Sequence, residues 1–172
     1  DYTQGLIEEK PGPDRLCDLG AVLANIGHRQ LALSCYEAAF ASYPDHFPSA
    51  MGLAETSAAT GFYDRSTSVL DRLLAEYPES YKLALTRARV FSWSARYEDA
   101  LDAYEKLYQK NPDNFVVLKE AARTAYWGKM ADAGSHYYQR IYTPSVDLIL
   151  LKHLRSKAEP ADDGLLESAF EN

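Results

Sequence analysis

Two arginines and two tryptophans have the residue types and the spacing best suited to binding chemistry. Arg123 follows Arg89 at the same interval at which Trp127 follows Trp93, and these are the only tryptophans in the chain. A guanidinium group can hold a carboxylate or a phosphate through two parallel hydrogen bonds. An indole ring at the end of a helix offers a flat stacking surface for sugars or aromatic side chains. These four residues predict a ligand surface that is both basic and aromatic.

The same four residues also allow a purely structural interpretation. The arginines can meet the carboxylate of Glu120 or Glu55, and the tryptophans can pack helix against helix. Both interpretations stay open at the level of the sequence.

No other set of residues has the spacing of a catalytic or metal site. Asp132 and His136 lie one helical turn apart, and we interpret them as a solvated pair. The other histidines are scattered, there is no glycine-rich phosphate loop, and no set of serine, histidine and acid is visible. Cys17 and Cys35 lack a metal-ligand spacing, and we interpret them as free packing residues. We therefore expect no enzyme activity, no catalytic residue, no metal site and no cofactor.

Length, composition and charge argue against a nucleic-acid-binding protein and against a membrane-spanning segment. The chain has 172 residues, of which 47% are hydrophobic, enough for one domain or one stacked array. A net charge of −7 does not give the basic footprint of a nucleic-acid-binding protein. No apolar run is long enough to span a bilayer. Because the chain begins at Asp1 without a signal peptide, we interpret it as a processed chain or a piece of a longer one.

Small residues recur at the interval that separates the arginines, and they fall into two sets. The first set is Gly20, Ala54, Ala88 and Ala122, and the second is Ala32, Ser66, Ala100 and Gly134. We interpret the two sets as the crossing points of paired helices, which pack so closely that a larger side chain would clash. The helix-ending prolines Pro44, Pro78 and Pro112 recur at this interval as well. Asp14 is the expected N-cap of the first helix, over residues 15–26.

The period, about 34 residues, and its residue types resemble those of tetratricopeptide (TPR) repeats. The family pattern is matched in the first repeat by Leu19-Gly20, Leu23, Ala32, Tyr36 and Pro44. The resemblance implies an all-α, right-handed superhelix of about four helix-turn-helix repeats plus a C-terminal capping helix. Its expected parts are an N-terminal extension (1–12), four repeats (13–46, 47–80, 81–114 and 115–145), a capping helix (146–156) and an acidic tail (157–172). Pro144 comes two residues early for the family pattern, so the close of the fourth repeat is a departure from it.

In TPR proteins the first helix of every repeat lines a concave groove, which is the usual ligand surface. On this resemblance, the basic and aromatic part of the groove consists of Lys82, Arg89, Trp93, Lys119, Arg123, Tyr126 and Trp127. Met51 and Ser92 also fall at groove-facing places. Cys17 and Ala21 stand where chaperone-binding relatives need polar donors for a carboxylate clamp, which argues against a chaperone-tail adaptor.

The third and fourth repeats carry a narrower resemblance in the segments RARVFSWSARYEDALDAYEKL and AYWGKMADA. They are similar to periplasmic TPR arrays of bacterial exopolysaccharide secretion proteins of the Pel and cellulose type. That resemblance implies a periplasmic scaffold of an envelope or export assembly, with polysaccharide-modifying enzymes among its partners.

We therefore expect a non-catalytic protein-protein interaction scaffold. One alternative is direct binding of an anionic polysaccharide or an acidic peptide in the groove. Another is self-association through the apolar stretch 146–154. A cytoplasmic location is the alternative to the periplasm.

Overall fold

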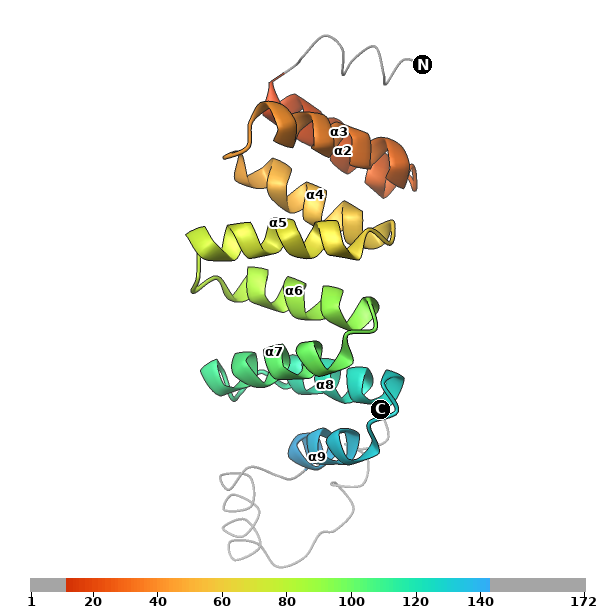
Figure 1. The fold of residues 1–172 in the computed structure, drawn as a ribbon, viewed down its shortest axis with the longest axis vertical. Helices are drawn as coiled ribbons and strands as arrows, with labels where there is room; N and C mark the ends of the chain where they lie inside the picture. Colours follow the sequence, from red (N-terminus) through yellow and green to blue (C-terminus); the bar gives the residue numbers. More distant parts are fainter. Residues whose placement is uncertain (1–11, 143–172) are drawn as a thin grey trace, which may run out of the picture.

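The computed structural model describes residues 12–142, and within this range the chain forms eight α-helices and no strand. Each helix runs back along its predecessor, and the helices stack one after another from α2 to α9 (Figure 1). The helices are α2 (Pro13–Asn25), α3 (Arg29–Ser42), α4 (Phe47–Ala59), α5 (Tyr63–Glu76), α6 (Tyr81–Trp93), α7 (Tyr97–Lys110), α8 (Phe115–Trp127) and α9 (Ala131–Tyr142). The first helices of successive pairs begin at one constant interval, and so do the second helices. That interval is the one found in the sequence, so the sequence period is also the period of the structure.

The turn inside each helix pair contains one residue in the left-handed backbone region. These residues are Gly27 (φ 89°), Gly61 (φ 86°), Ala95 (φ 61°) and Lys129 (φ 56°), which recur at the same interval. Glycine adopts this region without a steric penalty, whereas alanine and lysine do not. The first two turns thus use the favoured residue, and the last two reach the same geometry with a Cβ atom.

The small residues expected at helix crossings are buried, and one of them shows how close the helices come. A Cβ atom added to Gly20 would lie 2.9 Å from the ring of Tyr36, so a larger residue would displace that ring. Ala54, Ala88 and Ala122 are buried at the equivalent places. Gly134 differs, because its added Cβ atom would meet only Ala125 Cβ at 3.8 Å. The expected clash is confirmed at Gly20, whereas the place of Gly134 has room for the alanine found at the equivalent Ala32 and Ala100.

The buried apolar side chains form two clusters that divide along α6. One cluster reaches from α2 to α6 and includes Leu70 and Val90. The other reaches from α6 to α9 and includes Phe91 and Leu118. Because Val90 and Phe91 are adjacent in the chain, α6 belongs to both halves of the core.

The predicted N-cap of the first helix is wrong. The helix begins at Pro13, its cap residue is Gly12, and no side chain makes the capping hydrogen bond. Asp14 lies in the first turn instead. Proline suits the first helical position because a backbone N–H at that position would have no hydrogen-bond acceptor within the helix.

Several expectations concern residues outside the described range. They are the N-terminal extension up to residue 11, the close of the fourth repeat at Pro144, the capping helix 146–156 and the acidic tail 157–172. Within residues 12–142, none of the helices combines the length and the apolar character needed to cross a bilayer.

Candidate binding surface

The first helices of successive pairs share one side of the stack. α2 packs against α4, and α4 packs against α6. Three side-chain hydrogen bonds then join α6 and its cap to α8 and its cap: Arg89 Nη2 to Glu120 Oε1 (3.3 Å), Ser92 Oγ with Thr124 Oγ1 (2.8 Å), and Asn114 Nδ2 to Tyr81 Oη (2.6 Å). The equivalent residues of the third and fourth repeats therefore lie on adjacent helices.

Both candidate arginines contact the same carboxylate. Arg89 donates to Glu120 from α6, and Arg123 donates to it from one turn further along α8. The guanidinium group of Arg123 also lies 5.0 Å from the centroid of the Trp127 ring. The arginines thus have the partner proposed in the structural interpretation of the sequence. An anionic ligand at this place has to share or exchange partners with Glu120.

The aromatic residues of the candidate surface are open to solvent. Trp93 is 46% exposed, Trp127 is 42% exposed and Tyr126 is 77% exposed. More than half of each tryptophan is covered by the protein, and the remainder is available to a ligand. Exposed rings of this size contribute a large share of the contact energy where proteins bind one another.

Two lysines on the same helices are free to meet a ligand. Lys82 on α6 and Lys119 on α8 are exposed, and neither forms an ion pair with another described residue. With the two arginines they outnumber Glu120, so this part of an acidic protein carries a local positive charge. We call the set of Lys82, Arg89, Trp93, Lys119, Arg123, Tyr126 and Trp127 the α6–α8 face.

Two other predicted groove residues do not line a surface. Met51 is buried in the core, and Ser92 is buried between α6 and α8 with its hydroxyl bonded to Thr124. Ser92 faces the neighbouring first helix α8, and Met51 belongs to the first apolar cluster. The spacing alone did not separate that contact from the groove.

The structure also brings together a polar row that the sequence interpretation missed. Cys17 Sγ lies 3.4 Å from Ser49 Oγ, and Ser49 Oγ lies 2.6 Å from His46 Nδ1. His46 Nε2 lies 3.2 Å from Asp14 Oδ1. Asp14, His46 and Ser49 therefore form a continuous hydrogen-bonded row, which the sequence did not reveal.

This row has the geometry of a link between helices. Ser49 is fully buried, so no substrate can reach its hydroxyl. Burial also raises the pKa of the Cys17 thiol, which keeps it protonated and poorly nucleophilic. One set of protons satisfies every contact: Cys17 donates to Ser49, Ser49 donates to His46 Nδ1, and His46 Nε2–H donates to Asp14. The row thereby ties the start of α2 to the start of α4.

A spacing signal for this row was present in the sequence. The separation in the chain between Asp14 and His46 is the same as that between Cys17 and Ser49. Ser92 and Thr124 bond across α6 and α8 at this separation too. Residues on neighbouring first helices therefore meet slightly short of one full period, a rule that only the observed helix packing reveals.

Metal-type clusters and disulfides are not found in residues 12–142. No group of three or more histidine, cysteine, aspartate or glutamate side chains there is arranged to hold a metal ion. Cys17 and Cys35 are both free thiols, as the sequence interpretation predicted.

Comparison with known proteins identifies the fold. No protein-family model and no curated protein sequence matches the chain. Solved structures of MamA are similar to it. One is MamA of strain AMB-1 (TM-score 0.67, 17% identity, 83% of this chain and 80% of that chain). Another is a MamA fragment from Desulfovibrio magneticus RS-1 (TM-score 0.67, 17% identity, 86% and 80%). A third is MamA of MSR-1 (TM-score 0.59, 22% identity, 76% and 77%).

The fold is a TPR-type superhelix. This confirms the fold class expected from the repeat period. At these identities the likeness concerns the fold alone, so function has to be argued from the surface of this chain.

Proposed function

We propose that the protein is a non-catalytic protein-protein interaction scaffold, and that its α6–α8 face binds an acidic segment of a partner. The observation that supports this most directly is the exposure of Trp93, Tyr126 and Trp127 on two adjacent repeats. Aromatic residues and arginine are the residue types enriched at protein interfaces. TPR-type stacking supports the proposal as well, because it builds an extended surface from successive first helices.

Charge favours an acidic partner. Four cations on this face, with Glu120 as the acid among them, attract a carboxylate-bearing segment. Lys82 and Lys119 form no ion pair with a described residue. Binding of an acidic ligand therefore does not require either lysine to break an existing ion pair. The arginines are held in place by Glu120, which orients their remaining N–H groups. The lysines are therefore the better residues for testing the charge.

The test follows the emission of Trp93 and Trp127 while a peptide rich in Asp and Glu is added. We expect a saturable shift that weakens by about tenfold when the salt concentration rises from about 0.05 to about 0.5 M. Lys82→Gln with Lys119→Gln should weaken binding without leaving Glu120 unpaired. Arg29→Gln, at an exposed arginine on the second helix α3 that forms no ion pair with a described residue, is the control and should bind normally. A flat emission at millimolar peptide would reject the acidic-segment proposal.

Direct binding of an anionic polysaccharide is a second candidate for the same face. It is favoured by Trp93 and Trp127, which expose indole rings at equivalent places of neighbouring repeats. Stacking of sugar rings on indoles predicts that Trp93→Ala with Trp127→Ala abolishes binding of an anionic oligosaccharide. A peptide held mainly by charge would lose less. A titration with uronate oligomers of increasing length, with and without competing peptide, separates the two ligands.

We further propose, from the amino-acid sequence of the third and fourth repeats, that the protein is part of a bacterial envelope or exopolysaccharide export assembly in the periplasm. Polysaccharide-modifying enzymes are then the expected partners. Fractionation of the native cells tests the compartment, and recovery in the cytosol would favour the cytoplasmic alternative. Self-association through residues 146–154 lies outside the described residues, and a concentration-dependent mass measurement on the full chain tests it.

A further inference from the structure

A cavity of about 210 Å³ opens between α5, the start of α6 and α7. Its walls are mainly apolar and come from Leu74, Pro78, Tyr81, Ala84, Ala103 and Leu107, with the polar side chains of Glu79, Ser80 and Arg87 beside them. Lys106 and Lys110 of α7 stand at its rim. It uses the side of α6 that carries Tyr81 and Ala84, whereas Lys82 and Arg89 belong to the α6–α8 face. It is therefore a separate place on the molecule.

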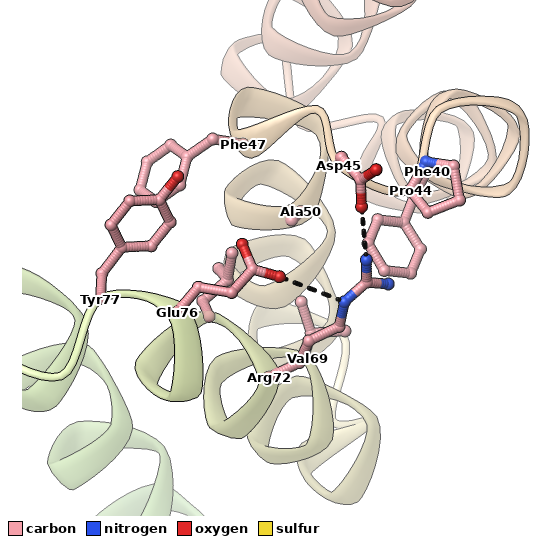
Figure 2. A pocket seen from close by; sticks show the side chains of 10 residues that line it. Phe40, Pro44, Asp45, Phe47, Ala50, Val69, Arg72, Glu76 and Tyr77 are labelled. Atoms are coloured by element: carbon pink, nitrogen blue, oxygen red, sulfur yellow. Dashed lines mark hydrogen bonds and ion pairs between the residues drawn. The ribbon is translucent and has the colours of Figure 1, made fainter.

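The equivalent place one repeat earlier is filled. It lies between α3, α4 and α5, and only about 10 Å³ remains open there. Figure 2 shows the rings that line this place: Phe40, with Pro44 beside it and Arg72 next to the ring, and on the other side Phe47 with Tyr77. The guanidinium group of Arg72 lies 5.4 Å from the centroid of that ring. This chain thus closes the first of these places with an aromatic side chain under a cation.

The place one repeat later is built in the same way. Tyr108 of α7 stands one full period after Leu74, and Tyr137 and Arg140 of α9 stand one period after Ala103 and Lys106. Arg140 lies 4.1 Å from the centroid of the Tyr108 ring, and Tyr137 is buried. Two of the three equivalent places therefore hold a ring and a cation from the chain itself.

The middle place is open because several of its residues are smaller, among them Asn111, which stands one period after Tyr77 of the filled place. Leu74 stands where the other places have Phe40 and Tyr108, and Ala103 stands where they have Val69 and Tyr137. The cation is still present as Lys106. The empty space therefore corresponds to the aromatic ring that Leu74 lacks.

The cation of the middle place also has no partner of its own among the described residues. Arg72 pairs with Asp45 at 2.9 Å and lies 3.8 Å from Glu76 (Figure 2). At the middle place Glu79 corresponds to Asp45, but it pairs with Lys110 at 2.8 Å. Lys106 is exposed and forms no ion pair within residues 12–142. A carboxylate brought by a ligand could therefore pair with Lys106, while Glu79 in the same pocket stays paired with Lys110.

We propose that this cavity, which we call the α5–α7 pocket, binds an aromatic side chain of an acidic peptide segment in a partner protein. The ring takes the space that Phe40 and Tyr108 fill in the neighbouring repeats, and a carboxylate next to it pairs with Lys106. The size is sufficient, since a cavity of about 150 Å³ with apolar walls accommodates benzene. The site is independent of the α6–α8 face, so either one can fail experimentally while the other stands.

The test uses fluorescence anisotropy with a labelled peptide in which one Phe is flanked by Asp and Glu, and a matched peptide with Ala in place of Phe. We expect the Phe peptide to bind at least about tenfold more tightly, a factor that corresponds to about 1.4 kcal/mol. Leu74→Phe with Ala103→Val introduces the residues that stand as Phe40 and Val69 in the filled place of the preceding repeat. This variant should fold at least as stably as the native chain and lose the preference for Phe.

Two further variants separate the pocket from the α6–α8 face. Lys106→Gln should weaken the Phe peptide and reduce the salt dependence of its binding. Lys82→Gln with Lys119→Gln should leave the preference for Phe over Ala unchanged. Equal affinity of the native and the filled chain for the Phe peptide would overturn the proposal. So would a self-association of the native chain that the filled variant abolishes, because the occupant would then be a second copy.

Discussion

Ser49 occupies the centre of the polar row that joins α2 to α4. Its hydroxyl is buried, and its removal takes away the closest hydrogen-bond partner of His46 Nδ1 in a poorly hydrated place. We expect Ser49→Ala to lower the free energy of unfolding by about 1–2 kcal/mol. Urea denaturation measures the loss. Ser34→Ala is the control, because Ser34 donates only to the Gln30 carbonyl on the surface and should cost little. Equal effects of the two substitutions would mean that the row does not stabilise the fold.

Tyr104 is a buried ionisable residue that makes the stability of the fold depend on pH in the alkaline range. Burial raises the pKa of its hydroxyl, and burial also raises the pKa of Cys35 and Tyr36. These groups stay protonated in the folded state, while the unfolded chain releases their protons near the ordinary values. Their contribution to stability is therefore complete below the ordinary pKa and is lost as the pH rises toward the folded-state value.

We accordingly expect the urea midpoint to fall between about pH 8 and about pH 11. Tyr104→Phe removes one of the titrating groups and should make the decline shallower. Tyr43→Phe, at an exposed tyrosine, should leave the decline unchanged. A native chain whose midpoint is constant over this range would contradict the assigned direction of the shifts.

At the scale of the helix pair, the left-handed turn residues divide the array into two favoured and two strained turns. Ala95 adopts φ 61°, where a Cβ atom costs energy, and glycine removes that cost. The gain is partly offset because glycine makes the unfolded chain more flexible. We expect Ala95→Gly to stabilise the protein by about 0.5–1 kcal/mol, measured by urea denaturation.

The reverse substitution is available in the same chain. Gly61 has φ 86°, and an added Cβ atom would meet nothing within 4 Å, so only the backbone is tested. Gly61→Ala should destabilise by about 1–2 kcal/mol, measured in the same denaturation experiment. Opposite signs for the two variants are the expected result, and equal signs would show that neighbouring contacts outweigh the turn geometry.

The helix pairs could be predicted from the sequence, because closely packed helices allow only small residues where they cross. The recurrence of Gly20, Ala54 and Ala88 with the prolines was enough to predict the helix pairs. Asp14 was misassigned because Pro13 opens the helix equally well. The α5–α7 pocket was not predicted, because it exists only where residue 74 lacks an aromatic ring. It is recognised by comparing this place in the structure with the place one repeat earlier, which Phe40 lines. The exposure of Trp93 likewise required the packing of whole helices.

At the scale of the whole molecule, the two apolar clusters that meet in α6 predict where a core defect is felt. Leu70 and Leu118 are both fully buried, one in each cluster. Leu70→Ala and Leu118→Ala should each cost about 2–5 kcal/mol. Hydrogen exchange should rise mainly in α3–α5 for the first variant and mainly in α7–α9 for the second. A uniform rise over all helices in both variants would indicate one cooperative unit.

The packing of each helix on its neighbours in the chain has a kinetic consequence. Within residues 12–142 the main helix contacts join consecutive helices or consecutive first helices, so these contacts do not wait for a distant segment to arrive. Chains dominated by local contacts fold quickly, because little entropy is lost in closing each loop. We expect the array to assemble from one end while the rest is still being synthesised. Stopped-flow refolding of the full chain, with a dominant phase faster than about a second, is the observation that fits this order of assembly.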